Sequence, residues 1–167
     1  MAIADDLIIL ARQERELVLP QFNESVAWQI GQALRELALT RQLGIVIDVQ
    51  RFGQPLFYCA LAGSTPDNAG WVRRKSRVVA RFHRSSYRVG QELAERKTTL
   101  AEKYGLADAD YAAHGGSFPL LVTGAGIIGT ITVSGLPQRL DHELVVEVLC
   151  QHLGKDYGSL ALPKPGG

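Results

Sequence analysis

A run of basic side chains in the middle of this sequence could bind an acidic ligand. No acidic residue occurs between Asp67 and Glu92, although that window holds seven basic residues. Arginine forks bind carboxylate or phosphate groups through two parallel hydrogen bonds. The run therefore predicts an anion site; the alternative is a solvated helix face, or an oligomer contact paired with acids such as Glu92, Glu95 or Glu143. The residues expected at the anion site are Arg73, Arg74, Lys75 and Arg77, and the run continues with Arg81, Arg84 and Arg88.

A glycine-containing loop brings a titratable ring close to flexible backbone. His114 is followed by Gly115, Gly116 and Ser117. Glycine lets the backbone approach a ligand closely, and histidine changes its charge near neutral pH. We expect these four residues to contact a small ligand; the alternative is that the glycines only turn the chain and His114 is an ordinary surface residue.

A second candidate segment follows an expected strand, where Ser134 and Gly135 precede Asp141 and His142. An aspartate beside a histidine could do acid/base chemistry, and we include Ser134, Gly135 and His142 among the ligand-binding candidates. Neighbouring residues on a helix point about 100° apart, however, so Asp141 is better explained as a capping or dipole partner. No serine, histidine and acid form a recognisable triad.

Three glycines, Gly124, Gly126 and Gly129, have the spacing of a dinucleotide-binding fingerprint. That fingerprint requires a helix to start at the third glycine. Here residues 130–133 are Thr, Ile, Thr and Val, which favour a strand. We therefore interpret the segment as a turn followed by a strand.

The composition excludes several classes of protein. The 167 residues are 46% hydrophobic and 21% charged, which is typical of one globular domain. A net charge of +1 argues against bulk attraction to nucleic acid. Cys59 and Cys150 are far apart and lack metal-site spacing, so we expect reduced thiols in a cytoplasmic protein and no metal site. No segment has the roughly 20 apolar residues of a membrane span.

Periodicity predicts one α/β domain of the α+β type over residues 1–159, with a flexible Pro/Gly-rich tail over 160–167. Asn23 and Thr65 with Pro66 are strong helix-start signals, and Gly154 is a helix-stop signal. Because strands joined by tight turns run antiparallel, the sheet is expected to be antiparallel. Helices are expected over 5–16, 24–43, 66–82, from 85 onward, briefly within 103–113, and over 138–153; strands are expected over 45–49, 55–60, 118–122 and 127–133.

Several motifs in one order make the sequence resemble the GlcG/HbpS-like superfamily, also called the haem-degrading domain family, in its bacterial and fungal UPF-type branch. The similarity covers about residues 17–153. The motifs are residues 65–69, Trp71 with Arg73, Arg74 and Lys75, the loop 114–119, residues 134–138, and Asp141 with His142.

The resemblance implies a profilin-like antiparallel sheet of four to five strands flanked by helices, assembly into homodimers or larger homo-oligomers, and a pocket for haem or another small ligand. It implies no particular reaction. Few histidines could hold a haem iron, namely His83, His114, His142 and His152.

Two functions compete on this basis. The first is a small-ligand or haem-handling domain, with His114 near the ligand and the basic run facing its acidic groups. The second is a non-catalytic oligomeric scaffold or partner-binding module, in which the basic run and the apolar residues of the same helix form an interface. Catalysis on a small anionic metabolite has only residue type in its favour, so whether the chain is an enzyme stays undecided.

Overall fold

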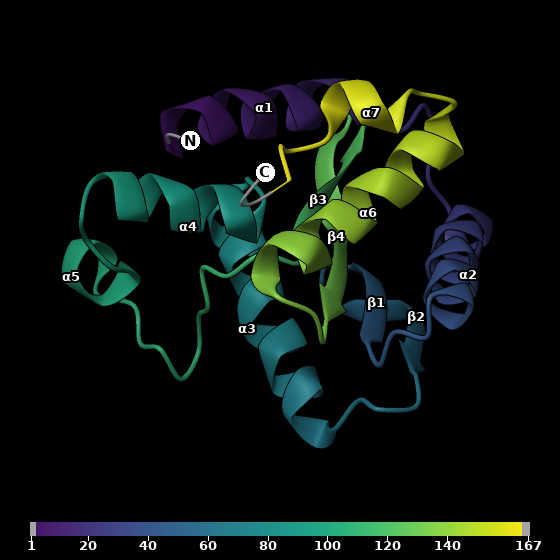
Figure 1. The fold of residues 1–167 in the computed structure, drawn as a ribbon, viewed down its shortest axis with the longest axis horizontal. Coiled ribbons are helices and arrows are strands. Elements are labelled where there is room, and N and C mark those ends of the chain that lie inside the picture. Colours follow the sequence, from purple (N-terminus) through teal and green to yellow (C-terminus); the bar gives the residue numbers. More distant parts are fainter. Residues whose placement is uncertain (1–2, 165–167) are drawn as a thin grey trace.

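The computed structural model describes residues 3–164, and the chain alternates helices with two β-hairpins (Figure 1). The predicted α+β class is confirmed, and the four strands and the longer helices have bounds close to those expected from periodicity. The short helix expected within 103–113 lies earlier, at 100–104, and the helix at 157–160 was not expected. In chain order they are α1 (Ile3–Glu16), α2 (Glu24–Thr40), β1 (Val46–Arg51), β2 (Gln54–Ala60), α3 (Pro66–Phe82), α4 (Ser86–Glu95), α5 (Leu100–Tyr104), β3 (Ser117–Val122), β4 (Gly126–Ser134), α6 (Gln138–Leu153) and α7 (Tyr157–Leu160).

The sheet has the strand order β2-β1-β4-β3, and all three neighbouring pairs are antiparallel. β1 pairs with β2 and β3 pairs with β4, so both expected hairpins are present. β1 also pairs with β4, which joins the two hairpins into one sheet. The segment containing Gly124, Gly126 and Gly129 forms the turn before β4 and then β4 itself. The interpretation as a turn and strand, rather than a dinucleotide-binding loop, is therefore confirmed.

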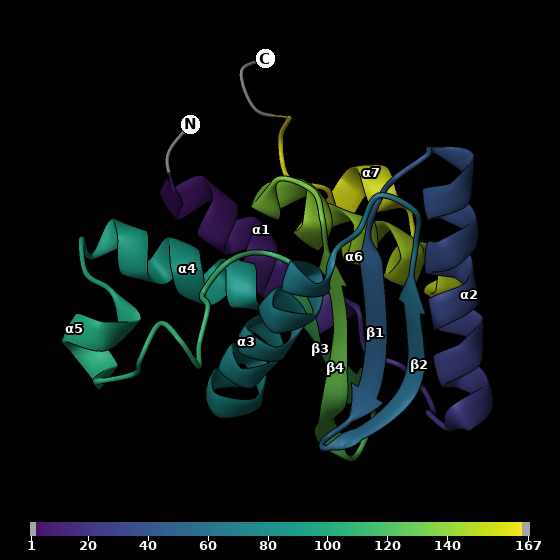
Figure 2. The same cartoon turned by 90° about the horizontal axis from the view of Figure 1, so that it is seen from below.

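Helices cover both faces of this sheet (Figure 2). Successive side chains of β1 point to opposite faces of the sheet, so alternate residues belong to different layers. Ile47 and Val49 belong to the main apolar core with residues of α2 and α6, whereas Asp48 is buried outside that cluster. α3 packs against the opposite face, over β3 and β4. The α3 side of the sheet is accordingly the more polar one.

Local capping signals fix where the helices begin and end. The Asn23 side chain accepts a hydrogen bond from the Val26 amide at the start of α2. At α3, Thr65 and Asn68 form a capping box before the proline at the first helical position. Gly154 ends α6 in the left-handed conformation. These boundaries agree with the sequence because each signal acts within one turn of helix.

The C-terminal segment differs from the expected flexible tail. Within the described residues, Leu160 is 1% exposed and belongs to the main core. Leu162 is also buried, in a small cluster with Leu10 and Tyr87. Apolar burial packs residues 160–162 against α1, at the start of the segment expected to be a flexible tail. Residues 165–167 of the expected tail lie outside the described residues.

None of the helices in the described part of the chain is both long and apolar enough to cross a membrane.

Candidate functional site

A buried ion pair connects α3 to the start of α6. Lys75 Nζ lies 3.0 Å from Asp141 Oδ2, and both residues are at most 3% exposed. Lys75 Nζ also donates to the carbonyl oxygen of Val133 at 3.1 Å. Burial lowers the pKa of Lys75 and raises the pKa of Asp141, while each charge opposes the shift of its partner. Such a pair is expensive to break, because either charge alone would be left buried.

Backbone donors complete the environment of Asp141. Its Oδ1 accepts a hydrogen bond from the Leu136 amide at 2.9 Å, and its Oδ2 accepts one from the Gly135 amide at 3.4 Å. Asp141 therefore ties the turn after β4 to the helix that follows it. Asp141 lies in the first turn of α6, as expected of a dipole partner, but it is not a helix cap, because the amides of Gly135 and Leu136 precede the helix. Its carboxylate also pairs with Lys75.

The glycine loop approaches the same ion pair. Gly116 has φ +139°, and a Cβ atom at this position would lie 2.3 Å from Val133 O and 2.7 Å from Lys75 Nζ. Only glycine has room there and tolerates this conformation without strain. The loop is held to α6 by the Gly115 amide, which donates to Gln138 Oε1 at 2.9 Å.

Arg74 and His114 both lie against Trp71, beside the ion pair. The Arg74 guanidinium carbon lies 4.1 Å from the centre of the Trp71 ring, and the Trp71 and His114 ring centres are 5.1 Å apart. Partial burial and the charges of Lys75 and Arg74 lower the pKa of His114. The imidazole is therefore neutral near pH 7, which is the form that binds a metal.

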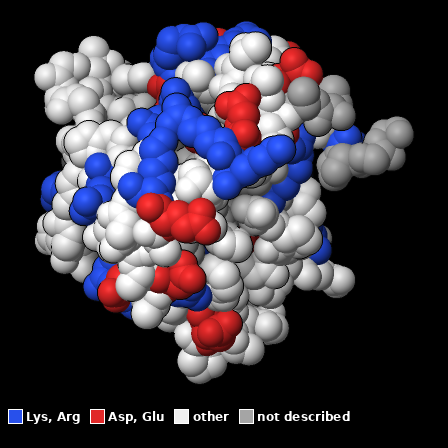
Figure 3. Space-filling model, turned by 90° about the vertical axis from the view of Figure 1, so that its left-hand side faces the viewer, with Lys and Arg blue, Asp and Glu red and all other residues white. Residues whose placement is uncertain are grey.

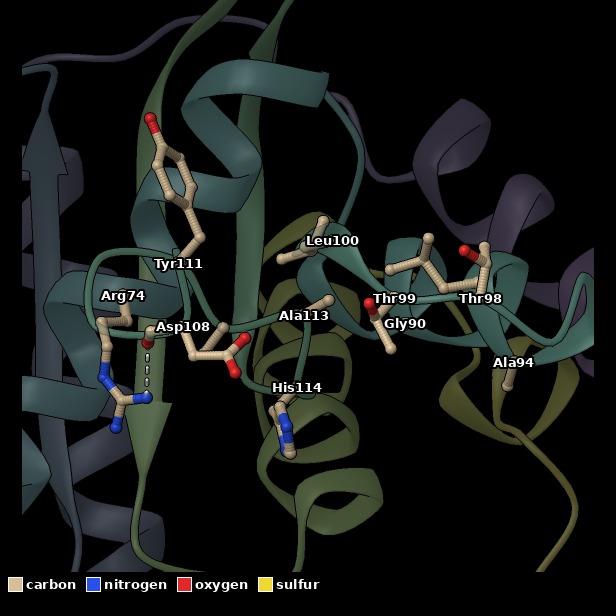
Figure 4. A pocket seen from close by; sticks show the side chains of 12 residues that line it. Arg74, Gly90, Ala94, Thr98, Thr99, Leu100, Asp108, Tyr111, Ala113 and His114 are labelled. Carbon is tan, nitrogen blue, oxygen red and sulfur yellow. Dashed lines mark hydrogen bonds between the residues drawn. The ribbon is translucent and has the colours of Figure 1, made fainter. Parts of the chain in front are cut away.

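His114 separates two cavities. One, here named the Lys75 cavity, has a volume of about 310 Å³ and is lined by Asn68, Trp71, Lys75, His114, Ser134, Gly135, Leu136, Gln138 and Asp141. The other, here named the α4 cavity, has a volume of about 330 Å³. Figure 4 shows the α4 cavity, with Arg74 and His114 on its boundary and the Arg74 to Asp108 hydrogen bond drawn as a dashed line. The α4 cavity is lined by Arg74, Gly90, Leu93, Ala94, Thr98, Thr99, Leu100, Asp108, Tyr111, Ala112, Ala113 and His114.

The structure brings together several of the residues expected at the site. Lys75, His114, Ser134 and Gly135 all line the Lys75 cavity, although they come from three separate segments. Arg74 lines the adjoining α4 cavity.

Other expected residues lie elsewhere. Arg73 and Arg77 are exposed, and both approach Asp110 Oδ1, at 3.8 and 3.3 Å. Ser117 is buried in a hydrogen-bonded chain, accepting from Thr132 Oγ1 at 2.9 Å. Figure 3 shows basic side chains gathered in a band beside acidic ones on the face that carries α3, α4 and α5. Much of the basic run therefore serves surface ion pairs, which each contribute little to stability.

His142 is buried on the far side of Asp141. It is 0% exposed, its Nε2 lies 2.8 Å from Gln13 Oε1, and its ring packs beside those of Tyr87 and Phe118. Burial, reinforced by the charge of Arg139, lowers the pKa of His142 to about 3. A neutral ring sealed in the core cannot reach a ligand in the Lys75 cavity. Within residues 3–164, moreover, no three His, Cys, Asp or Glu side chains converge to hold a metal ion.

Besides Asp141, four residues that line the Lys75 cavity are not among the site residues expected from the sequence, namely Asn68, Trp71, Leu136 and Gln138. Asn68 was not singled out for chemistry, yet its Nδ2 donates to Ser134 Oγ at 3.2 Å. The sequence places Trp71 and Gln138 only in motifs of the family resemblance, and Gln138 also at the start of the expected last helix. The capping-box position of Asn68 was readable from the sequence, but its reach to β4 depends on how α3 packs on the sheet.

Residues 22–150 match a family model described as haem degrading protein HbpS-like. The chain belongs to the HbpS-like family. The superfamily inferred from the ordered motifs is thereby confirmed. The matched range contains every residue that lines the Lys75 cavity.

Individual relatives agree with the family match. The chain is 58% identical over 164 residues to a UPF0303 protein of Paraburkholderia phymatum, covering 98% of this chain and 99% of the relative. It is similar to the crystal structure of the Ybr137w protein, with a TM-score of 0.82 and 27% identity over 89% of this chain and 87% of that chain. It shares its fold with the crystal structure of a PduOC:heme complex, with a TM-score of 0.64 and 15% identity over 80% of this chain and 94% of that chain.

Proposed function

We propose that this HbpS-like chain binds a small acidic ligand beside the side chains of Arg74, Trp71 and His114, with haem as the first candidate. The observation that carries the proposal is the position of His114. Its side chain lines both cavities, and its ring centre lies 5.1 Å from that of Trp71. An ordinary surface histidine is not expected to contact an aromatic ring and to line two cavities, so we assign His114 to ligand binding.

The residues around His114 fit haem. Haem, when bound, supplies an iron that accepts a neutral imidazole as its ligand. His114 would hold the iron, because its lowered pKa keeps the imidazole unprotonated. Arg74, on the boundary of the α4 cavity, would hold a propionate. Leu93, Leu100 and Ala113 would give the macrocycle apolar contacts. The family description and the heme complex of the PduOC relative support this choice of ligand.

The Lys75 cavity would take the polar part of a smaller acid. Two of the three N–H bonds of Lys75 are accounted for by Val133 O and Asp141 Oδ2. The third N–H bond can therefore donate to a carboxylate, together with the hydroxyl of Ser134. The ion pair with Asp141 keeps the ammonium charged while it is buried.

A haemin titration followed by absorbance tests the proposal. We expect a saturable Soret shift at one haem per chain, and at least about a tenfold loss of affinity in His114→Ala, because the residue that would hold the iron is removed. His152→Ala is the matched control, since His152 is a half-buried histidine near the end of α6 that lines neither cavity. A response without saturation, or equal affinities for the two variants, would refute haem binding at His114.

A partner-binding module is the second candidate, favoured by the outer face of α2. Trp28 and Leu39 are 58% and 50% exposed, and their separation of eleven residues places them on one side of the helix. Exposed large apolar groups on one side are typical of contact surfaces. Size-exclusion chromatography with light scattering tests self-association. A monomeric mass at micromolar concentration would count against a homo-oligomer, and Trp28→Ser should lower the mass of any assembly that uses this face.

A further inference from the structure

A third cleft lies on the other side of α3 from the Lys75 cavity. It has a volume of about 330 Å³ and runs between α3 and the turn of the β1–β2 hairpin. Here it is named the hairpin cleft. It shares no lining residue with the Lys75 cavity or the α4 cavity, so it is independent of the proposed haem site. Its lining includes Gln50, Phe52, Ser76, Arg77, Ala80 and Thr130.

Thr130 gives the cleft a polar group without a partner. The residue is 1% exposed, and its Oγ1 is buried without a hydrogen bond to any described residue. Thr132, two residues further along the same face of β4, shows the usual arrangement by donating to Ser117 Oγ at 2.9 Å. A buried polar group left unpaired carries a desolvation cost, and most such groups in native proteins have a partner. A bound molecule that reaches Thr130 would remove this cost.

Gln50 adds a second polar group of defined orientation. Its Nε2 donates to Asp48 Oδ2 at 2.8 Å, which fixes the amide. The amide oxygen of Gln50 is then available as an acceptor. Gln50 and Thr130 are paired in register on neighbouring strands, so both groups can contact one hydroxyl of a ligand. That hydroxyl would donate to Gln50 Oε1 and accept from Thr130 Oγ1.

The rim supplies a positive charge and apolar surface. The Arg77 side chain is 45% exposed, and its only acidic partner among the described residues is Asp110, which is itself exposed. An exposed pair of this kind is weak, so Arg77 can also bind a ligand carboxylate. Phe52 is 45% exposed, and with Ala80 it offers apolar contact to a flat ring. No acidic residue lines the cleft.

We propose that the hairpin cleft is a second binding site, which takes a small, flat carboxylic acid bearing a hydroxyl group, of the hydroxylated aromatic acid class. The hydroxyl contacts Thr130 and Gln50, the ring lies against Phe52 and Ala80, and the carboxylate faces Arg77. The volume lies at the lower end of the range for ligand pockets, roughly 300–1,000 Å³, which suits a single-ring compound.

The test uses 4-hydroxybenzoate as the probe, with amide shifts of the full chain followed by NMR. We expect saturable shifts that include the amides of Gly53, Ala80 and Thr130. Benzoate, which lacks the hydroxyl, should bind at least about fivefold more weakly, and 4-hydroxybenzamide, which lacks the charge, should do the same. Absence of saturable shifts in the cleft up to about 10 mM probe would overturn the proposal.

Two variants and a control separate the contacts. Thr130→Val keeps the shape of a strand residue and removes no existing hydrogen bond, so the fold should persist and the preference for 4-hydroxybenzoate over benzoate should disappear. Arg77→Gln should weaken both acids and leave 4-hydroxybenzamide unchanged. Arg81→Gln, an exposed arginine one turn further along α3 that does not line the cleft, should bind like the parent chain. Parent-like binding by Thr130→Val and Arg77→Gln would show that the probe binds elsewhere.

Discussion

Replacing either partner of the Lys75–Asp141 pair should destabilise the fold strongly, and the two replacements should not be additive. Breaking a buried ion pair from one side costs about 3–5 kcal/mol, because the remaining charge stays buried. Lys75→Met leaves Asp141 with two backbone N–H donors, from Gly135 and Leu136, so we expect about 3 kcal/mol. Asp141→Asn leaves Lys75 with only Val133 O, so we expect a loss nearer to 5 kcal/mol.

The double variant measures how much of each loss comes from the orphaned charge. In Lys75→Met with Asp141→Asn no charge is buried, and the amide oxygen can still accept from the Leu136 amide. We therefore expect the double variant to be more stable than the sum of the single losses predicts, by at least about 2 kcal/mol. Urea unfolding of the four proteins gives this coupling energy. Arg73→Gln, which removes an exposed cation from the same helix, is the control and should change stability by less than about 1 kcal/mol.

The pH dependence of the Lys75→Met loss provides an independent check. Burial raises the pKa of Asp141 above its ordinary value of 3.8, and Lys75 opposes that rise. Without Lys75 the folded-state pKa of Asp141 rises further, so protonation relieves the buried charge. The loss should be smallest below about pH 4 and should grow as the pH rises through the raised pKa. Additive single losses, or a Lys75→Met loss that is equal at pH 4 and pH 7, would refute this account of the pair.

Two further predictions concern the core histidine and the glycine loop. The ring signals of His142, assigned by comparison with His142→Gln, should not titrate between pH 7 and pH 5, because burial lowers its pKa to about 3. The stability supplied by the neutral ring is complete above the ordinary pKa of 6.5 and is lost as the pH falls from 6.5 toward 3. A ring midpoint near pH 6 would contradict that burial. Gly116→Ala should lower the free energy of unfolding by more than about 2 kcal/mol, because its Cβ would clash with Val133 O. Gly124→Ala, which has φ +80° but no atom within 4 Å of the new Cβ, separates strain from clash and should cost about 1 kcal/mol in the same urea experiment.

The secondary structure was predictable because its signals are local. Asn23, Thr65 with Pro66, and Gly154 each act within one helical turn, and the structure has a helix boundary at each of them. The β-branched runs likewise predict the two hairpins, which need only a tight turn to pair. The packing of the segment after residue 159 was not predictable in the same way. Its proline and glycine content describes the local chain, whereas the burial of Leu160 depends on a core built by distant elements.

The site was predicted in part, and the errors have a geometric cause. The basic run was treated as one feature, although successive helix residues are about 100° apart. Lys75 lies four residues after Trp71, on the same side of α3, and its side chain is buried. Arg73 and Arg77 lie on the solvent-exposed side of the helix. That separation could have been found from the helical period. The burial of His142 could not, because it results from the way α1 and α6 pack together around Gln13.

The packing of the C-terminal segment on α1 has a consequence for how the chain acquires its structure during synthesis. Gln13 Nε2 donates to the carbonyl oxygen of Leu160, a contact that spans 147 residues of chain. A nascent chain that ends before residue 160 already contains all four strands, yet Leu10 still lacks its contact with Leu162. Contacts of such long separation form late, because the intervening chain must first be made and ordered. Helix α1 is thus among the last of the described helices to be fully buried, although it is synthesised before the others.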